Sequence, residues 1–214
     1  MSEAFRAVIF DLGGVVLDSP LHAIARYEAE LGIPSGHVNR VVAAGGPGGA
    51  WARLERGELG LAAFEPAFER ECAAAGHAIS AREMMLRIAA ASAPRPAMVS
   101  AIRALRRRGL AVAALTNNWV SDGDPQAGLA ELRAAFDAFI ESSVVGLRKP
   151  DPRIYLHACE ALGVRPPEAV FLDDIGRNLK AARELGMATI KVEEPGAALA
   201  ELARVLRLEA GALA

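Results

Sequence analysis

The sequence predicts an α/β protein: a parallel sheet of about five strands, with an all-helical segment inserted after the first strand. Three observations support this. An apolar run of strand type, Ala7–Phe10, stands near the N-terminus; residues 20–95 show no strand pattern; and strand and helix patterns alternate from Pro96 onward. Short runs that are apolar on both faces are typical of buried parallel strands. Their alternation with helices favours a doubly wound, Rossmann-like sheet.

The first expected strand, Ala7–Phe10, ends in Asp11, and Gly13 and Gly14 follow. In open parallel sheets, ligands bind just beyond the carboxyl ends of the strands. Asp11 is therefore expected at a binding or active site, where glycines let the backbone approach a ligand closely. A strand that merely enters a tight turn would give the same residues, and the rest of the chain has to decide between these interpretations.

The inserted segment is expected to be helical throughout. Residues 21–31 form an amphipathic pattern that ends at Gly32, and further helices are expected over 51–56, 61–75 and 81–91. The glycine-rich stretch 45–49 follows a short helical stretch. It lacks the Lys-Ser/Thr pair and the preceding strand of a P-loop. A turn that borders a pocket is the favoured interpretation, and a phosphate cradle is the alternative.

The rest of the chain alternates between the two patterns. A helix over 96–108 has a basic end that suits its dipole and is stopped by Gly109. Asp151 is expected to cap a later helix, with Pro152 at its first position. Strands are expected over 110–115, 136–142, 169–172 and 188–192, and the other helices over 126–135, 152–162, 177–185 and 197–206, with a loop at 121–125.

Composition limits the expected partners. The 214 residues carry a net charge of −2, which gives no basic surface for nucleic acid or anionic membranes. No apolar run approaches the roughly 18 residues needed to span a bilayer, and the first residues lack the pattern of a signal peptide. Cys72 and Cys159 are far apart, so buried thiols in a cytoplasmic setting are expected. The expected assembly is a monomer or a homodimer.

Polar side chains follow each of the first four expected strands. They are Asp11, Thr116 with Asn117, Lys149 a little beyond the third strand, and the pair Asp173 and Asp174. The carboxyl ends of parallel strands share one edge of the sheet. The combination predicts phosphoryl transfer, which needs a nucleophile, a cation held by oxygens and donors to the phosphoryl group. The adjacent carboxylates of Asp173 and Asp174 would repel each other unless a metal cation or Lys149 neutralised them, and Mg²⁺ suits a site made of oxygens.

In this order, and over nearly the whole chain, these motifs resemble the four motifs of the haloacid dehalogenase-like superfamily. The resemblance is carried by Asp11 at its strand end, Thr116-Asn117, Lys149-Pro150 and Asp173-Asp174. It implies a Mg²⁺-dependent hydrolase, in the first place a phosphatase acting on a small phosphorylated metabolite. It also implies a core domain of residues 1–18 and 96–214 and a helical cap domain of residues 19–95, which closes over the site and selects the substrate.

The resemblance assigns a role to each position. Asp11 would be the nucleophile that forms an aspartyl-phosphate, and Lys149 would neutralise charge on Asp11 and on the phosphoryl group. The implied donors to the substrate are Thr116, the backbone amide of Asn117, Lys149 and the backbone at Gly13 and Gly14. The implied ligands of Mg²⁺ are Asp11, the carbonyl group of Gly13, and Asp174 with its neighbour Asp173, all oriented by Asn178.

The chain departs from the superfamily at Gly13. Phosphatases of this kind usually carry a second Asp there, which acts as the general acid for the leaving group. General acid catalysis contributes about 10²–10⁴-fold, so a slow enzyme, or one limited to good leaving groups, is expected. A cap residue or the substrate could also supply the proton. Asp18 is one candidate substitute, although a place in the cap hinge is favoured for it.

Two other functions remain open. A 2-haloacid dehalogenase also uses an Asp nucleophile and does not need the second Asp. It needs no metal, however, and the pair Asp173-Asp174 argues against it. A low-activity or non-catalytic domain that binds phosphate ligands or partner proteins would account for the missing acid. The presence of Asp11, Thr116 and Lys149 argues against that alternative.

Overall fold

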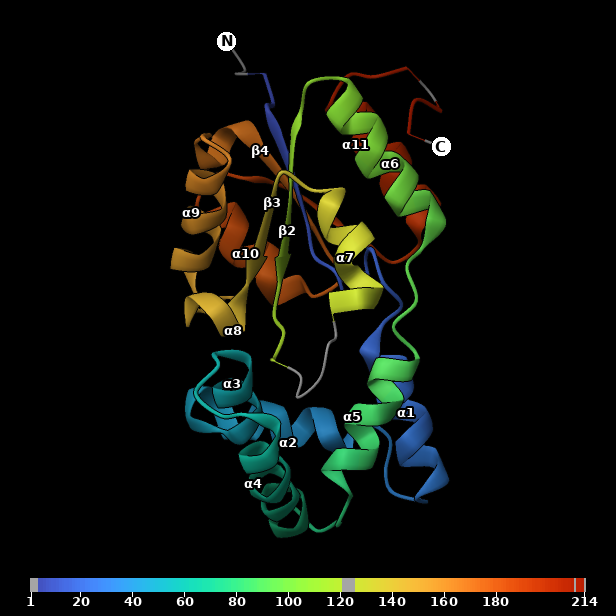
Figure 1. Cartoon of the computed structure of the whole chain (residues 1–214), viewed down its shortest axis with the longest axis vertical. Helices are drawn as coiled ribbons and strands as arrows, with labels where there is room; N and C mark the ends of the chain where they lie inside the picture. Colours follow the sequence, from blue (N-terminus) through green and yellow to red (C-terminus); the bar gives the residue numbers. More distant parts are fainter. Residues whose placement is uncertain (1–3, 121–125, 210, 214) are drawn as a thin grey trace.

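A computed structural model describes residues 4–120, 126–209 and 211–213 of the chain. Five parallel strands form one sheet in the order β3-β2-β1-β4-β5 (Figure 1). The chain therefore winds to one side of β1 and later to the other, and the order reverses between β1 and β4. The predicted doubly wound sheet is confirmed. The strands are β1 (Ala7–Phe10), β2 (Ala111–Thr116), β3 (Ala138–Glu141), β4 (Ala169–Asp173) and β5 (Ala188–Lys191).

Helices cover both faces of this sheet. Alternate strand residues point to opposite faces, so Val8 and Phe10 pack against α6, α7 and α11, whereas Ile9 and Phe171 pack against α9 and α10. Figure 1 shows the two helical layers on either side of the strands. Burial on both faces explains why the strand sequences are apolar throughout. The helices are α6 (Pro96–Arg107), α7 (Gln126–Ala134), α9 (Pro152–Ala161), α10 (Gly176–Glu184) and α11 (Pro195–Val205).

The predicted elements are found to within two residues at their ends, the third strand included. That strand is confined to Ala138–Glu141, because the chain turns at Ser142 into a short helix, α8 (Ser142–Val145), which has no counterpart among the predicted elements. The predicted cap at Asp151 is confirmed, since its Oδ1 accepts a hydrogen bond from the amide of Arg153 at 3.0 Å. The predicted loop at 121–125 lies outside the described residues.

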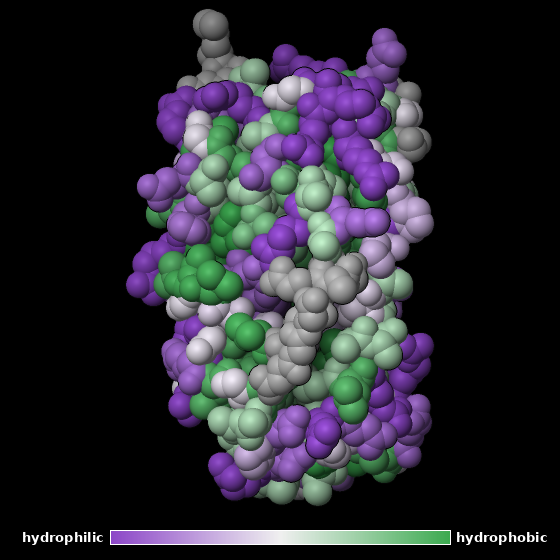
Figure 2. All heavy atoms as spheres, viewed as in Figure 1, coloured by the Kyte–Doolittle hydropathy of each residue, from purple (hydrophilic) through white to green (hydrophobic). Residues whose placement is uncertain are grey.

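The inserted segment forms a helical lobe of its own beyond the carboxyl ends of the strands (Figure 1). As predicted, its described residues form helices and no strand. Its apolar core joins Tyr27, Leu54, Phe64 and Phe68, and Trp119 from the sheet lobe packs against that core. On the face drawn in Figure 2, apolar residues gather where the two lobes meet. The helices are α1 (Pro20–Glu30), α2 (His37–Gly45), α3 (Ala50–Glu55), α4 (Leu61–Ala74) and α5 (Ala81–Ala90).

Glutamates from neighbouring helices cap the helices of this lobe. Helix α2 starts after Gly36, which has no side chain to accept from the first amides. Glu28 of α1 does so instead, with bonds of 2.6 Å from the amide of Gly36 and 2.8 Å from that of Val38. Glu69 of α4 likewise accepts from the amide of Ala81 at 2.8 Å, at the start of α5. These caps satisfy the first amides of α2 and α5, and they also fix the helices relative to one another.

Two connecting segments join the lobes and run side by side. Leu17 bridges to Pro94, and the amide of Asp18 donates to the carbonyl of residue 93 at 3.0 Å. The guanidinium of Arg95 donates to the carbonyl of Gly14 at 2.8 Å and pairs with Asp18 at 3.3 Å. Asp18 thus belongs to the connection between the lobes. None of the helices in the described part of the chain is long and apolar enough to cross a membrane.

Candidate active site

Lys149 lies at the centre of the candidate site. Its side chain is 1% exposed, and its Nζ lies 2.7 Å from Asp11 Oδ1 and 2.8 Å from Asp173 Oδ2. Burial by itself would lower the pKa of Lys149, but the two carboxylates outweigh burial and raise that pKa. Lys149 therefore remains a cation in a site with little water, where it can neutralise an anion.

Asp11 follows β1 at the point where the strand order reverses, which is where ligands bind in such sheets. Its Oδ1 accepts from the amide of Leu12 at 2.7 Å as well as from Lys149. Burial raises the pKa of Asp11 to about 8; Lys149 opposes this effect, and Asp173 adds to it. The group is held in one orientation, which suits a nucleophile, and the raised pKa means that a cation must displace its proton near neutral pH before it can attack.

Asp173 ends β4 and is fully buried, with both oxygens engaged. Its Oδ1 accepts from the amide of Ile175 at 2.7 Å and from the side chain of Asn178 at 3.1 Å. Its Oδ2 accepts from Lys149. Asn178, for which an orienting role is predicted, thus lies against Asp173 from α10. These contacts make Asp173 a partner of Lys149 first of all.

Asp174 has an oxygen, Oδ1, that is buried and without a hydrogen-bond partner in the described part of the structure. Burial raises the pKa of Asp174, and the neighbouring Asp173 raises it further. One oxygen from each of Asp11, Asp173 and Asp174 lies within 4.8 Å of the others. A buried oxygen without a partner, among three clustered carboxylates, fits a hard divalent cation such as Mg²⁺.

Gly14 makes room for this cluster. Its φ is +86°, and a Cβ at this position would lie 2.3 Å from Asp174 Oδ2. Both the backbone conformation and the space exclude a larger side chain. Gly14, which the sequence places among the substrate-binding residues, thus lies directly against the predicted metal ligand Asp174.

Thr116 and Asn117 stand at the end of β2. Thr116 is buried, and its hydroxyl donates to the carbonyl of Asn117 at 3.4 Å. The side chain of Asn117 holds the backbone of Lys149: its Nδ2 donates to the Lys149 carbonyl at 3.1 Å, and its Oδ1 accepts from the Lys149 amide at 2.8 Å. From the sequence, only the backbone amide of Asn117 was expected to contribute to the site, as a donor to the substrate. Its side chain has a second role, which is to position Lys149.

A cavity of about 150 Å³ lies beside these groups, between the two lobes. The helical lobe lines it with apolar side chains such as Ile24 and Val38. The glycine-rich stretch 45–49 is predicted to border a pocket, but none of its residues lines this one; it ends α2 and makes a short 3-10 turn. Of the predicted site residues, Asp11, Gly13, Asn117, Lys149 and Asp174 line the cavity, while Gly14, Thr116 and Asp173 are buried outside its lining.

The cavity lining also contains residues that were not predicted, among them the charged pair Glu55 and Arg148. Glu55 comes from α3, and its Oε2 lies 2.5 Å from Arg148 Nε. The indole of Trp51 donates to the other oxygen at 3.0 Å. Charged residues are usually solvated, but this pair is largely buried where the two lobes meet. The sequence signals are weak: Glu55 stands one helical turn after Trp51, and Arg148 directly precedes Lys149.

The sequence model of the haloacid dehalogenase-like hydrolases matches residues 5–186. The chain belongs to this family. It is a hydrolase, with the Asp11, Lys149 and Asp173-Asp174 motifs of the family placed at one edge of its sheet.

Three curated relatives are similar to the chain. Acyl-CoA dehydrogenase family member 10 of Mus musculus is 39% identical over 95% of this chain and 19% of its own length. Bifunctional epoxide hydrolase 2 of Sus scrofa is 37% identical over 94% of this chain and 39% of its own. This haloacid dehalogenase-like hydrolase thus spans less than half of either protein. Phosphoglycolate phosphatase of Thiobacillus denitrificans is 29% identical over 85% of this chain and 80% of its own.

Solved structures share the fold. A predicted haloacid dehalogenase-like hydrolase of Porphyromonas gingivalis matches with a TM-score of 0.70 at 22% identity, over 97% of this chain and 100% of its own. A family enzyme of Bacteroides thetaiotaomicron, solved with magnesium and inorganic phosphate, matches with a TM-score of 0.62 at 18% identity, over 89% and 95%.

Proposed function

We propose that this hydrolase is a Mg²⁺-dependent phosphatase that cleaves a small phosphate monoester through an aspartyl-phosphate on Asp11. The observation that carries the proposal is the buried ammonium of Lys149 between Asp11 and Asp173, beside the unpartnered oxygen of Asp174. The cluster supplies a nucleophile, a cation for the phosphoryl oxygens and oxygens for a metal. The phosphatase among the relatives, and the magnesium and phosphate of the Bacteroides enzyme, support it.

In the first step, Asp11 attacks phosphorus, and the bond from phosphorus to the leaving oxygen breaks. Lys149 offsets negative charge on Asp11 and on the phosphoryl oxygens, and we assign the hydroxyl of Thr116 and the amide of Asn117 as further donors. In the second step, water attacks the aspartyl-phosphate, which restores the carboxylate and releases inorganic phosphate.

We assign Asp11, Asp174 and the carbonyl of Gly13 as the ligands of Mg²⁺. Asp173 lies behind these ligands and pairs with Lys149. The charges support a divalent cation, because three clustered carboxyl groups face one ammonium and, when all three are ionised, leave two negative charges uncompensated. When bound, Mg²⁺ supplies positive charge where the transferred phosphoryl group becomes more negative.

Residues 19–95 would act as the cap, and residues 1–18 with 96–214 as the core. The separate apolar core of the helical lobe and the bridge between Leu17 and Pro94 support this division. The cavity lies between the lobes, so closure would exclude water from Asp11. Because Asp18 pairs with Arg95 in the connection, we do not assign it the missing acid role.

Hydrolysis of phenyl phosphate tests the proposal. Activity should require Mg²⁺ and be lost on chelation, and Asp11→Asn should lower kcat by at least about 10³-fold because the amide is a poor nucleophile. Asp18→Asn, the matched control, should keep most of the activity.

Three outcomes would point elsewhere. Phosphate ester turnover that is unaffected by metal removal would contradict the metal assignment. Metal-independent chloride release from 2-chloropropionate would establish a dehalogenase instead. Phosphate binding without turnover of any ester would favour the non-catalytic alternative.

A further inference from the structure

A second charged pair lines the cavity, apart from the reactive cluster. Glu55 of the helical lobe and Arg148 of the sheet lobe both belong to the lining. Glu55 Oε2 lies 2.5 Å from Arg148 Nε, and the two side chains are 9% and 18% exposed. An ion pair so far removed from water is less screened than one on the surface.

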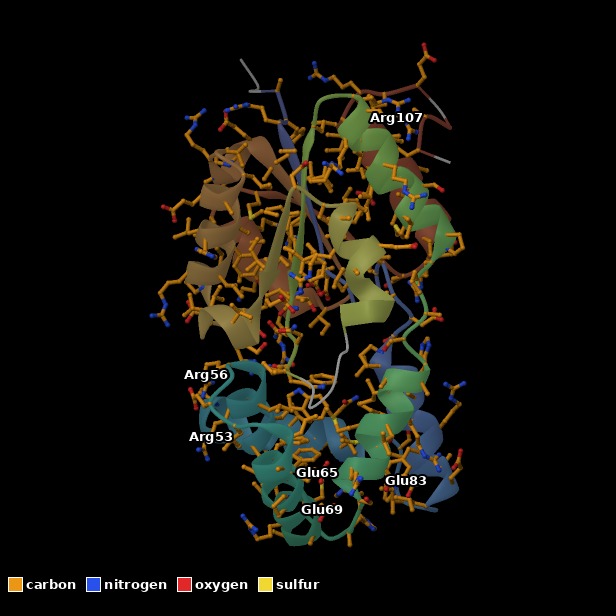
Figure 3. The ribbon with its side chains drawn as sticks, in the orientation of Figure 1. Arg53, Arg56, Glu65, Glu69, Glu83 and Arg107 are labelled. Atoms are coloured by element: carbon orange, nitrogen blue, oxygen red, sulfur yellow. The ribbon has the colours of Figure 1, made fainter. Side chains whose placement is uncertain are left out.

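The carboxylate of Glu55 is held in place from both lobes. Trp51, one turn earlier on α3, donates to Oε1 at 3.0 Å, and Asn117 Nδ2 lies 3.4 Å from Oε2. The other charged residues of this stretch, Arg53 and Arg56, lie at the outer edge of the helical lobe (Figure 3). Glu55 is therefore the acidic group that α3 presents to the cavity.

The charges of this pair cancel. The helical lobe adds apolar side chains and the neutral Asn39 to the cavity wall. Arg177 also lines the cavity but is exposed, so water and salt screen its charge. A second anionic group on a substrate would meet the carboxylate of Glu55 and would have to compete with it for Arg148.

We propose that Glu55 is a specificity-determining residue. By neutralising Arg148, Glu55 restricts the site to phosphate monoesters whose organic part is uncharged. Esters whose organic part carries a carboxylate are excluded. This inference rests on the proposed phosphatase function. A carboxylate brought beside Glu55 would lose water without gaining a partner, which is a repulsive element in recognition. Without the charge of Glu55, the planar guanidinium of Arg148 would be free to bind such a carboxylate.

The test compares two esters of the same shape, 4-carbamoylphenyl phosphate and 4-carboxyphenyl phosphate. The wild type should prefer the carbamoyl ester. Glu55→Gln keeps the size of the side chain and an acceptor oxygen but removes the charge. It should shift the ratio of kcat/KM values toward the carboxylate ester by roughly ten-fold or more. Comparing ratios between variants cancels the difference in leaving-group chemistry.

Glu58→Gln is the matched control. Glu58 pairs with Arg56, is exposed and does not line the cavity, so the same change of charge should leave the ratio unchanged. Arg148→Met added to Glu55→Gln should remove the gain. Arg148→Met alone leaves Glu55 charged and should shift preference in the opposite direction, toward 4-(aminomethyl)phenyl phosphate. This second variant keeps the proposal testable if Glu55→Gln does not fold.

An unchanged ratio in Glu55→Gln, or an equal shift in Glu58→Gln, would overturn the role of Glu55. Binding of the two esters to Asp11→Asn variants, followed by the fluorescence of Trp51 and Trp119, separates this inference from the proposed function. A shifted binding preference with no turnover by any variant would keep the role of Glu55 and reject the phosphatase. Turnover without a shift would reject only the role of Glu55.

Discussion

The charge balance around Lys149 governs how the site takes up protons and cations. Lys149 contacts Asp11 and Asp173, while Asp174 keeps an oxygen without a partner among the described residues. A buried cluster with excess negative charge can be relieved by a proton or by a metal ion. Protons and Mg²⁺ should therefore compete at Asp11.

The concentration of Mg²⁺ needed for half-saturation should fall as the pH rises from 6 to 8. Burial raises the pKa of Asp11 to about 8, so below that pH the metal-free site holds a proton that the metal must displace. Displacing one proton changes the apparent affinity by up to about ten-fold per pH unit. Titrations of the melting temperature against Mg²⁺ at several pH values measure this, and an affinity that does not change over this range would contradict it.

Gly13 is the position of the missing acid, and the structure leaves limited room there. A Cβ on Gly13 would lie 3.2 Å from Cδ of Pro20, so an added side chain requires a small shift of α1. Gly13→Asp should increase the hydrolysis of ethyl phosphate about ten-fold more than that of 4-nitrophenyl phosphate, because only a poor leaving group needs the proton.

Gly13→Asn is the control, since it crowds Pro20 equally but offers no acid, and it should accelerate neither ester. Equal acceleration of both esters by Gly13→Asp would remove the link between Gly13 and the missing acid.

At the scale of elements, the helices of the helical lobe depend on one another for their ends. Glu28 is 1% exposed and caps α2 from α1, where the residue before the helix, Gly36, has no side chain. A carboxylate at a helix N-terminus also interacts favourably with the helix dipole. The cap is thus a tertiary contact, and the lobe should lose stability as a unit when it is removed.

Glu28→Gln should lower the free energy of unfolding by about 1–2 kcal/mol, because the amide keeps the shape but is a weaker acceptor without charge. Urea unfolding measures the change. Glu30→Gln is the control: Glu30 lies on the same helix, is 58% exposed and pairs with Arg87, so a loss within about 0.5 kcal/mol is expected. Equal losses in the two variants would contradict the capping role of Glu28.

At the scale of the whole molecule, the backbones of the two lobes approach closely at Gly57, just after α3. Its φ is +70°, and a Cβ there would lie 2.3 Å from the carbonyl oxygen of Ser143 in α8. Only glycine permits this approach. The contact lies two residues from Glu55, so it also sets how far α3 and its cavity residues reach toward the sheet.

Gly57→Ala should hold the lobes slightly apart and lower kcat/KM for phenyl phosphate by about ten-fold, since small displacements of positioning groups are costly to catalysis. Gly163→Ala is the control. Gly163 has a similar φ of +64°, with nothing within 4 Å of an added Cβ. It should lose stability by about 1 kcal/mol without this loss of activity. A similar loss of activity in both variants would show that the contact has no part in catalysis.

Local patterns in the sequence predicted most of the strands and helices. Strands buried on both faces are apolar throughout, as at Ala7–Phe10, and helix ends carry their own signals, as at Asp151 and Gly109. The short helix α8 was not predicted, because the strand was expected to run to Ser142, where the chain instead turns into the helix. Ser142 Oγ accepts from the amide of Asn118 at 2.9 Å, a contact made across strands.

The sequence by itself determined the sheet, the inserted helices and the strand-end residues Asp11, Lys149, Asp173 and Asp174. These depend on periodicity and on the rule that parallel strands end at one edge, and both are local or topological properties. Only the tertiary structure decided that the side chain of Asn117 holds Lys149, and that Glu55 and Arg148 form a pair inside the cavity. Both contacts join residues far apart in the sequence, and the burial of Glu55 and Arg148 depends on how the two lobes approach, which no local pattern encodes.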